Sequence, residues 1–589
     1  MCRRYFDTPP PWRKYRFFRR ARSCAILTPA VVLAGGFILL ASGITAIAAL
    51  PAGSGVVSGI VVSEDGLPLA SVNVRPQGAS TATVTDGSGA FAVGGLPWGS
   101  NVTISAWKEG YYCGIARDCP VPAEGVSVRL IRVQSRDNPL YSWVPPTSRE
   151  VKGSCAECHN PAIIEMSLND AHLKSARNPR FLTMYYGTDT QGNRSAATTW
   201  GKGTGPWKNT LMPLPPDPSQ PYFGPGYVQD FPGLPIDCTA CHIPGATLSG
   251  RPDPAGVTGT DTFGIHCDFC HKTADILIDP VTRMPFQVLT GVRSMKITRP
   301  FTDDPERPQL FFGTFEDDNV PEEDTALPLY SESRFCAPCH TGGFWNTGIY
   351  NSYGEWINSP YADVTSGKFK SCQDCHMPSP TEWKGQRLVN VAPGKGGIDR
   401  DPSRIHSHLT SIDEGLLRNS LTMTAGAEMS SGRLIVNVTI TNDRTGHHIP
   451  TDCPLRHMIL VIDTRDPEGN RLKQDSGNVV PDWCGKGDPE QGRYAGLPGN
   501  VFAKVLKEKW TEHYPAQAYW RHTDDYQDNR IAACKSDKSS YAFLVSGPGK
   551  YSIAVTLIYR RAFIELMEIK KWDAPDVVMA LEHLTLTIP

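Results

Sequence analysis

Five copies of Cys-x-x-Cys-His between residues 155 and 376 constrain this chain more than any other feature of its sequence. Two thiols three residues apart reach the two vinyl groups on one porphyrin edge, and the following imidazole can ligate the iron. A zinc site or a redox dithiol would also use Cys-x-x-Cys, but neither needs a His after every second Cys. The pattern therefore predicts five covalently attached haem c groups. The motifs comprise Cys155, Cys158 and His159; Cys238, Cys241 and His242; Cys267, Cys270 and His271; Cys336, Cys339 and His340; and Cys372, Cys375 and His376.

Length and charge limit what else the chain can be. A chain of 589 residues is too long to fold around one hydrophobic core, and its length suggests three or four domains. The net charge of −2 gives no overall field that would attract nucleic acid, so we expect no nucleic-acid partner. Haem is attached to Cys outside the cytoplasm, so the chain is predicted to be exported into a compartment that permits disulfides.

The N-terminus has the pattern of a targeting segment. Residues 1–24 carry eight basic residues and one acidic residue, and residues 25–49 carry no charge. This length suits a membrane span, and the basic flank places the N-terminus in the cytoplasm. Ala46-Ile47-Ala48 would also suit signal peptidase, which would make the segment a cleaved signal. We favour an uncleaved anchor in the cytoplasmic membrane, with the rest facing the periplasm or the cell exterior.

Residues 55–131 predict a small β-sandwich, because short strands at 59–62, 72–74 and 102–106 alternate with Gly and Pro turns. Gly-Leu-Pro-Leu at 66–69, Thr-Asp-Gly-Ser-Gly-Ala-Phe at 85–91 and Gly-Tyr-Tyr at 110–112 resemble the carboxypeptidase regulatory-like domain. The resemblance implies a spacer or adhesion module without chemistry of its own. Cys113 and Cys119 follow closely, and export favours a disulfide between them over two thiols.

Residues 132–410 form the predicted haem region, with many turn residues, short helices and mainly irregular structure. Its acidic run at 316–324 is predicted to be a solvated loop, with a calcium site or a dock for a basic partner as alternatives. Residues 411–589 return to alternating strands at 434–440, 458–462 and 551–557, which predict a C-terminal β-sandwich packed against the haem region. Cys453, Cys484 and Cys534 allow one disulfide and one thiol.

The expected fold class is therefore multidomain. It comprises an N-terminal membrane anchor (1–50), a small β-sandwich (55–131), a mainly irregular and α-helical multihaem core (132–410) and a C-terminal β-sandwich (411–589).

The second axial ligands decide what the irons can do. A haem closed by two His transfers electrons, whereas an open haem can bind a substrate such as nitrite or hydroxylamine. Ten His lie outside the motifs. His172 lies on a predicted helix thirteen residues after the first motif, His266 directly precedes the third, and His447 lies in a loop between two predicted strands. We predict five bis-His haems, with His448 and His457 in reserve. The predicted second ligands are His172, His266, His406, His408 and His447.

The five motifs, Gly-Ile-His-Cys-Asp-Phe-Cys-His-Lys at 264–272 and the stretch from Trp356 to Pro378 resemble multihaem c-type cytochromes. The matching superfamily includes cytochrome c-554, hydroxylamine oxidoreductase and pentahaem nitrite reductase, and it implies close haem pairs that form one electron wire. Pentahaem nitrite reductase attaches its catalytic haem through Cys-x-x-Cys-Lys, which is absent here. Hydroxylamine oxidoreductase has eight haems and a cross-linked tyrosine, for which no match is found.

These departures favour an electron carrier over a catalyst. Its expected partners are redox proteins, either other cytochromes or a quinol-oxidising membrane complex. The first alternative is an oxidoreductase acting on a small nitrogen or sulfur compound at one open haem. The second is an adhesive surface protein in which the β domains dominate.

The motif count makes a direct prediction. Mass spectrometry of the mature exported protein should show five haem additions, and a Cys336→Ala/Cys339→Ala double variant should show four. Fewer than five additions in the fully matured wild type would show that at least one motif does not attach haem.

Overall fold

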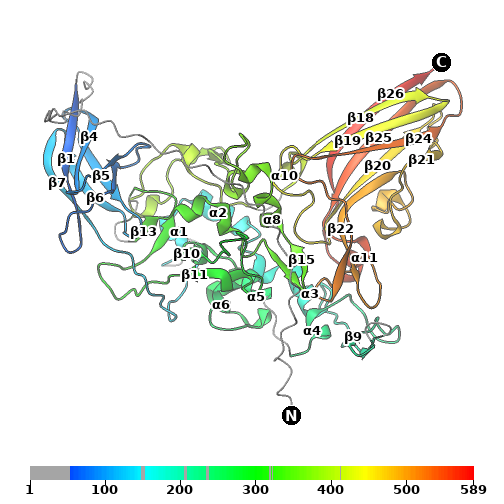
Figure 1. Cartoon of the computed structure of the whole chain (residues 1–589), viewed down its shortest axis with the longest axis horizontal. Helices are drawn as coiled ribbons and strands as arrows, with labels where there is room; N and C mark the ends of the chain where they lie inside the picture. Colours follow the sequence, from blue (N-terminus) through cyan, green and yellow to red (C-terminus); the bar gives the residue numbers. More distant parts are fainter. Residues whose placement is uncertain are drawn as a thin grey trace, which may run out of the picture. The chain divides into compact units, whose positions relative to one another are not determined.

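The computed structural model describes residues 53–147, 153–203, 208–233, 238–317, 320, 323–410 and 413–589. These residues form several small sheets and few helices (Figure 1). The predicted anchor at 25–49 and its basic flank lie outside the described residues. In the part of the chain that is described, none of the helices combines the length and the apolar character needed to cross a bilayer.

The N-terminal β region contains two small sheets, whose strand orders are β4-β1-β7 and β3-β2-β5-β6. β1 is antiparallel to β4 and parallel to β7. Alternate residues of β1, such as Val57 and Val61, are buried in one core with Val74, Ile104 and Val128. The strands are β1 (Ser54–Ser63), β2 (Asn73–Pro76), β3 (Thr83–Val84), β4 (Ala90–Pro97), β5 (Asn101–Trp107), β6 (Gly114–Pro120) and β7 (Ala123–Leu130).

The disulfide predicted between Cys113 and Cys119 is wrong. Cys119 lies within β6 and Cys113 directly precedes that strand. Six residues of extended chain span about 20 Å, whereas the Cα atoms of a disulfide lie within about 7 Å. Cys119 instead joins the core of the N-terminal β region, and Cys113 packs with Trp107 and Ala326.

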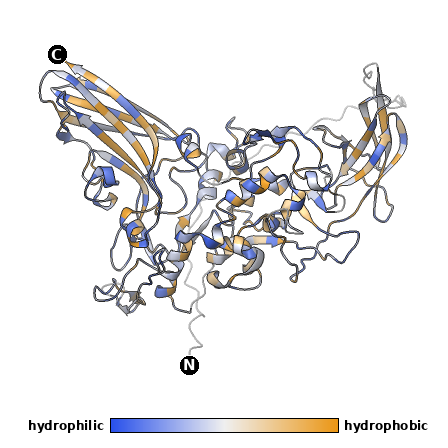
Figure 2. Cartoon of the chain, turned by 180° about the vertical axis from the view of Figure 1, so that it is seen from behind, coloured by the Kyte–Doolittle hydropathy of each residue, from blue (hydrophilic) through white to orange (hydrophobic). Residues whose placement is uncertain are grey.

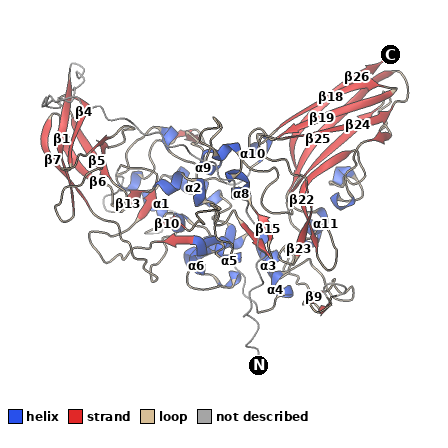
Figure 3. Cartoon of the chain, in the orientation of Figure 1, coloured by secondary structure: helices blue, strands red, loops and turns tan. Residues whose placement is uncertain are grey.

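Short helices carry the haem motifs (Figure 3). Four of the five motifs form a single helical turn, which places its two Cys three residues apart on neighbouring faces. The motif helices are α1 (Cys155–Cys158), α5 (Cys238–His242), α7 (Cys267–Cys270) and α9 (Cys372–His376), while the fourth motif follows a 3-10 turn at Ser333–Phe335. Between them lie α2 (Pro161–Asn169), α3 (Pro179–Tyr186), α4 (Tyr227–Asp230), α6 (Pro244–Thr247) and α8 (Ser352–Ile357).

Two-stranded ribbons complete the haem region. They are β8 (Trp200–Lys202) with β9 (Leu211–Pro213), β10 (Thr273–Ile276) with β11 (Met295–Ile297), β12 (Phe311–Gly313) with β13 (Asp324–Ala326), β14 (Gly342–Phe344) with β15 (Thr347–Tyr350), and β16 (Glu382–Trp383) with β17 (Gln386–Arg387). The helix predicted at His172 is not formed there. α2 ends at Asn169, and His172 lies in the turn that follows.

Long antiparallel strands form the C-terminal region, in sheets ordered β18-β19-β24-β21 and β23-β22-β20-β25-β26. Apolar and polar residues alternate along these strands, which Figure 2 shows as orange and blue stripes. Residues from both sheets, including Val436, Leu460 and Val555, share one buried core, as the alternation predicts. The elements are α10 (Glu414–Arg418), β18 (Thr422–Ser430), β19 (Arg433–Thr441), β20 (His457–Arg465), β21 (Gln474–Ser476), β22 (Gly499–Glu508), β23 (Thr523–Asp528), β24 (Ser536–Leu544), β25 (Gly549–Arg560), α11 (Ile564–Lys570) and β26 (Val577–Ile588).

The disulfide predicted among Cys453, Cys484 and Cys534 does not form, because the three thiols occupy separate environments. Cys484 is buried beside Val480 and Ile558, and Cys453 packs in a different apolar cluster around Trp520. Cys534 accepts a hydrogen bond from the Lys368 ammonium at 3.4 Å.

Residues at the start of the acidic run are structural, which corrects the prediction of a solvated loop. Asp317 is fully buried, pairs with the equally buried Arg400 and accepts a 2.6 Å hydrogen bond from the Gly78 amide. Glu316 pairs with Arg75. These two carboxylates join the N-terminal β region to the haem region, and a buried charge of this kind requires such partners.

The C-terminal β region is joined to the haem region by buried polar groups as well. The Arg521 guanidinium donates two hydrogen bonds of 2.8 Å to the Asp230 carboxylate, and the Trp520 indole donates a third. At the end of α11, the buried Lys570 ammonium donates to three backbone carbonyls of the haem region. These belong to Thr183 (3.0 Å), Thr188 (3.0 Å) and Pro225 (2.6 Å).

We expect Lys570→Met to destabilise the protein by about 2–4 kcal/mol, because the three buried carbonyls lose their donor. Urea unfolding followed by circular dichroism measures the loss. Lys550→Met, at an exposed position of β25, is the matched control and should leave the unfolding midpoint unchanged. Equal effects of the two substitutions would contradict the role given to Lys570.

Candidate haem centres and their ligands

Hydrogen bonds at Nδ1 of the motif imidazoles leave Nε2 available to bind iron. A His that ligates a metal through Nε2 donates its Nδ1–H to a carbonyl or carboxylate, which fixes the tautomer. Three motif His have such partners. The Nδ1 bonds run from His159 to the Val391 carbonyl (3.2 Å), from His271 to the Phe312 carbonyl (2.6 Å) and from His340 to Asp452 Oδ2 (3.1 Å).

Burial keeps most of these rings neutral. It lowers the pKa of His159, His242 and His376 to about 4, and it also lowers the pKa of His271. The Nε2 lone pair is therefore available to a metal at neutral pH, since a ligating His has to be neutral.

His340 differs because its Nδ1 partner is a carboxylate. Burial acts to lower the pKa of His340, but the Asp452 carboxylate outweighs burial and raises it. Asp452 is held by Ser352, whose hydroxyl donates to its other oxygen, and it adopts a left-handed backbone with φ of 63°. A carboxylate on the far nitrogen makes an imidazole a more basic ligand.

His172 faces the fourth motif. Its ring centroid lies 6.4 Å from that of His340, with the planes at 84°. A metal–imidazole bond is about 2 Å long and the ring centroid lies about 1 Å beyond the nitrogen, so two imidazoles on one metal have centroids about 6 Å apart. His172 Nδ1 lies 2.8 Å from Asp170 Oδ1 and 2.8 Å from the Thr410 hydroxyl. The pair therefore fits one iron between its rings.

His447 has the same relation to the fifth motif. Its ring centroid lies 6.3 Å from that of His376, with the planes at 21°. His447 Nδ1 donates to the His448 carbonyl at 2.8 Å, which leaves Nε2 without its proton. His447 comes from the loop between β19 and β20, so the C-terminal region supplies this imidazole.

His406 and His408 lie in an extended stretch, in which Ile405 packs with Ala162 and Ile163 of α2. Ser407 between them is buried on the opposite side, so both imidazoles leave the chain in the same direction. His406 Nδ1 donates to the Met377 carbonyl at 2.9 Å. Burial, followed by the nearby rings of His271 and His159, lowers the pKa of His408 to about 3.

His266 is placed differently from the other predicted ligands. It is the N-cap of α7, and its Nδ1 accepts a 3.1 Å hydrogen bond from the Phe269 amide. Its proton therefore resides on Nε2, which lies 3.9 Å from Asp261. This is the opposite tautomer to that of a ligand bound through Nε2. The residue directly before a helical motif occupies the N-cap position. The sequence alone could therefore have indicated that His266 caps this helix.

His242 makes no ring contact with a non-motif His in the described part of the chain, although His172 is near enough to contribute to lowering its pKa. Its ring stacks on Phe181 of α3 at 4.1 Å and 6°. The remaining His are engaged elsewhere or exposed: His448 lies near Glu355, His457 stacks on Phe563, His522 stacks on Trp345, and His513 and His583 are exposed.

Motif cysteines from different motifs approach one another, and this gives the spatial order of the five sites. The thiols of Cys155 and Cys267 are within hydrogen-bonding distance, which joins motifs one and three. Motif four lies next to motifs five and two, because the thiols of Cys336 and Cys372 are within hydrogen-bonding distance, as are those of Cys339 and Cys241. Cys270 of motif three interacts with both cysteines of motif four. The order is therefore one–three–four, with two and five as separate branches from four.

These arrangements fit haem c. Each thiol pair reaches one porphyrin edge, and six imidazoles hold their Nδ1 in hydrogen bonds that leave Nε2 for a metal. They are His159, His271, His340, His172, His406 and His447. Asp452 is a functional residue that the sequence did not indicate, because 112 residues separate it from His340.

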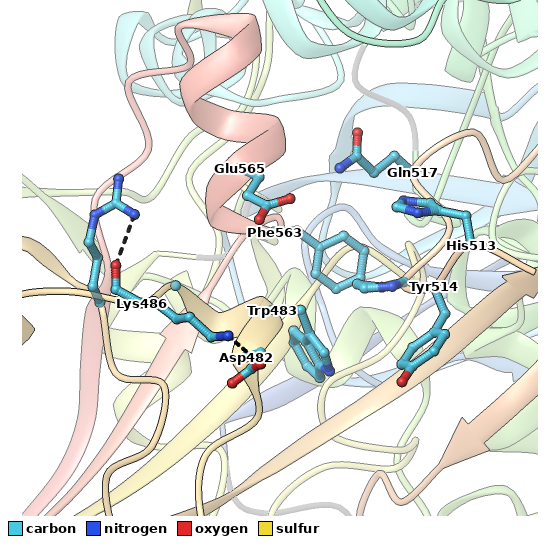
Figure 4. A pocket seen from close by; sticks show the side chains of 11 residues that line it. Asp482, Trp483, Lys486, His513, Tyr514, Gln517, Phe563 and Glu565 are labelled. Atoms are coloured by element: carbon cyan, nitrogen blue, oxygen red, sulfur yellow. Dashed lines mark hydrogen bonds and ion pairs between the residues drawn. The ribbon is translucent and has the colours of Figure 1, made fainter. Parts of the chain in front are cut away.

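A pocket in the C-terminal region is separate from these centres (Figure 4). It has a volume of about 400 Å³ and includes Trp483, Tyr514 and Phe563 in its lining. An ion pair between Lys486 and Asp482 lies along its rim. No predicted iron ligand lines it.

Comparisons with known proteins agree with a multihaem assignment. No protein-family profile matches the chain. The crystal structure of a penta-heme cytochrome c552 from Thermochromatium tepidum superposes with a TM-score of 0.50 at 16% identity, over 76% of this chain and all of that one. The multiheme cytochrome MtrC of Shewanella baltica (strain OS185) is 30% identical over 74 residues, which are 13% of this chain and 10% of that protein.

The chain thus shares the fold of a pentahaem cytochrome, and the comparisons support haem c as its cofactor. The coarse resemblance to multihaem cytochromes is confirmed. Membership of the cytochrome c-554 superfamily and the carboxypeptidase regulatory-like domain remain predictions.

The opposed imidazole pairs predict specific spectroscopic changes. His172→Ala and His447→Ala should each convert one low-spin haem to high-spin, because each removes one of two imidazoles from an iron. Magnetic circular dichroism of the ferric protein measures the high-spin fraction, which should rise by about one haem in five.

His266→Ala is the matched control, since His266 is as buried as a ligand but has the capping tautomer. It should leave the spin states unchanged. A new high-spin haem in His266→Ala, with none in His172→Ala or His447→Ala, would reverse this assignment.

Proposed function

We propose that this protein is an exported electron carrier in which five haem c groups transfer electrons between a membrane donor and an outer acceptor. The observation that carries the proposal is the opposition of His172 to His340 and of His447 to His376, at separations that suit one iron each. Two imidazoles on an iron close it to substrates and leave electron transfer as its chemistry. The shared pentahaem fold supports the same conclusion.

The proposed axial pairs are His172 with His340 and His447 with His376. We propose His406 and His408 as second ligands for the irons of His159 and His271, which is supported for His408 by the effect of both motif imidazoles on its pKa. His266 caps α7 and is left out of this set. The iron of His242 then has no second His.

Haem c supplies one-electron oxidation and reduction when bound, and the chain sets the conditions. Buried carbonyls fix the tautomers of His159 and His271, and the motif cysteines keep the sites in contact. The Asp452 carboxylate makes the His340 imidazole more electron-rich, which favours the oxidised metal and lowers the potential of that centre.

Motif four is the branch point of the proposed pathway. Because motifs two, three and five all adjoin it, an electron that enters at motif one passes motif three before it reaches motif four. From there it can continue to motif two or to motif five. The protein therefore offers two ends for exchange with redox partners, which we propose are other cytochromes or a quinol-oxidising membrane complex.

We place the protein outside the cytoplasmic membrane. Residues 25–49 would anchor it if uncleaved, and cleavage at Ala46-Ile47-Ala48 would release it. The covalent attachment of haem to Cys supports export in either case.

One observation favours a second candidate function. Among the described residues, the ring stacked on His242 is that of Phe181 and not that of a non-motif His, so we infer that the iron of His242 can take an exogenous ligand. An oxidoreductase acting on a small nitrogen or sulfur compound would use this centre, with the other four haems as its electron supply.

Protein film voltammetry tests the proposal. We expect a reversible envelope of five electrons in wild type and no catalytic current with nitrite or hydroxylamine. Asp452→Asn should shift the one-electron component of one haem in that envelope to a higher potential, by about tens of millivolts. The reason is that an amide makes the His340 imidazole a less basic ligand than a carboxylate does.

Asp463→Asn, which affects an ion pair with Arg465 and Arg471 in β20, should leave the envelope in place. A large catalytic current would select the oxidoreductase. An envelope of fewer than five electrons in protein that carries five haems would contradict the continuous pathway.

A further inference from the structure

Three segments of the C-terminal region surround the pocket of Figure 4, which none of the predicted iron ligands lines. Its volume of about 400 Å³ lies within the range of ~300–1,000 Å³ in which proteins bind small molecules. The segments are the turn that begins at Asp482, the loop between β22 and β23, and the start of α11. Residues far apart in the chain therefore meet around one space.

Aromatic rings form a large part of the pocket wall. The ring centroids of Trp483 and Phe563 lie 5.5 Å apart with the planes at 85°, and the His457 ring stacks on Phe563 at 5.4 Å. Tyr514 stacks on Tyr526 of β23 at 4.4 Å. Contacts with His457 and Tyr526, which lie outside the lining, hold the three lining rings in place. A ligand would therefore meet a wall that is already formed, which lowers the cost of binding.

Four polar side chains of the lining have no hydrogen-bond partner in the described part of the chain. They are the Glu565 carboxylate, the Gln517 amide, the His513 imidazole and the Trp483 indole N–H. In the view of Figure 4, Glu565 and Gln517 lie above the Phe563 ring and Trp483 lies below it. The set contains donors and acceptors together, because an amide and an imidazole each supply both, a carboxylate only accepts and an indole only donates.

The other charges of the lining are already paired. The Lys486 ammonium lies 2.6 Å from the Asp482 carboxylate, and Arg493 pairs with Glu568. Glu565 is the one charged lining residue that makes no ion pair among the described residues. An inorganic anion would thus meet an unpaired carboxylate and no unpaired cation. A ligand that donates hydrogen bonds is favoured instead, because hydrogen bonds to a carboxylate are charge-assisted.

We propose that this pocket binds a neutral sugar, either free or as the end of a polysaccharide chain. Each hydroxyl of a sugar both donates and accepts, so the ligand can donate to Glu565 and exchange hydrogen bonds with Gln517 and His513. The C–H groups on the face of a sugar ring carry partial positive charge, and they pack on the negative face of an aromatic ring. This inference goes beyond the proposed electron transfer and does not depend on it.

Two other classes of ligand match fewer of these groups. An alkylammonium cation would pack on the aromatic rings and pair with Glu565, but its C–H surface would leave Gln517 and His513 without hydrogen bonds. A flat apolar molecule would cover the rings and would remove water from the Glu565 carboxylate without replacing its hydrogen bonds, which is costly. A sugar satisfies the rings and the polar side chains together.

A microarray of neutral glycans, probed with the holoprotein, tests the proposal. The array carries oligosaccharides of hexoses, N-acetylhexosamines, pentoses and deoxyhexoses, and we expect wild type to bind a subset of them. Isothermal titration with the best glycan of the array and with its terminal monosaccharide then measures affinity. Equal affinities for the two point to a free sugar as the ligand, and a higher affinity for the glycan points to the end of a chain.

Glu565→Gln should weaken binding of that glycan about 10-fold, since it replaces a charge-assisted hydrogen bond with a neutral one. Gln517→Leu should weaken it about 3- to 10-fold, since it removes neutral hydrogen bonds and keeps a side chain of similar size. Glu414→Gln is the matched control and should bind like wild type. Glu414 is an exposed glutamate in the first turn of α10, as Glu565 is in the first turn of α11.

Failure of wild type to bind any neutral glycan of the array would overturn the proposal. Equal affinities of wild type, Glu565→Gln and Gln517→Leu would overturn it as well, because the sugar would then bind elsewhere. Binding of choline chloride in the same titration, with no glycan bound, would assign the pocket to a cation. Glu565 is exposed and Gln517 is half-buried, so both variants are expected to fold, and either one keeps the test decisive if the other does not.

Discussion

Each haem site depends on two constraints: the motif imidazole has to keep one tautomer, and it has to lie at a fixed distance from the second imidazole on the other side of the metal. A neutral imidazole has one donor and one acceptor nitrogen, so a hydrogen bond at Nδ1 decides what Nε2 can do. The bonds from His159, His271, His406 and His447 to backbone carbonyls make this choice inside a buried region.

The loop between β19 and β20 is the clearest case of one segment serving several centres. His447 faces His376, Asp452 accepts from His340, and Cys453 packs in the apolar cluster that includes Met184 of α3. The neighbouring His448 amide donates to Glu355, which also pairs with Arg530. A rigid sandwich with a large common core can hold such a loop in position, as loops on rigid scaffolds commonly do. The C-terminal region is thus part of the haem architecture.

Branching at motif four gives the two ends different environments. At motif five, His447 opposes the motif imidazole and supports a closed iron. At motif two, Phe181 stacks on the motif imidazole. The same arrangement is what an oxidoreductase would need, so the chemistry of the second motif separates the two functions.

The sequence by itself predicted the cofactor class, the five attachment motifs and the two β-rich regions, because each prediction rests on local spacing; the comparisons support haem c, and the structure has the two β-rich regions. The spacing of two thiols and an imidazole is fixed by the covalent chain, and the alternation of polar and apolar residues in a strand is a short-range pattern. Only the tertiary structure decided which His faces which motif, that His266 caps a helix, and that Asp317 is buried against Arg400. It also separated the cysteines expected to pair, and it brought Asp452 to His340. These contacts join residues far apart in the chain, and their geometry depends on how the regions pack rather than on any neighbouring residue.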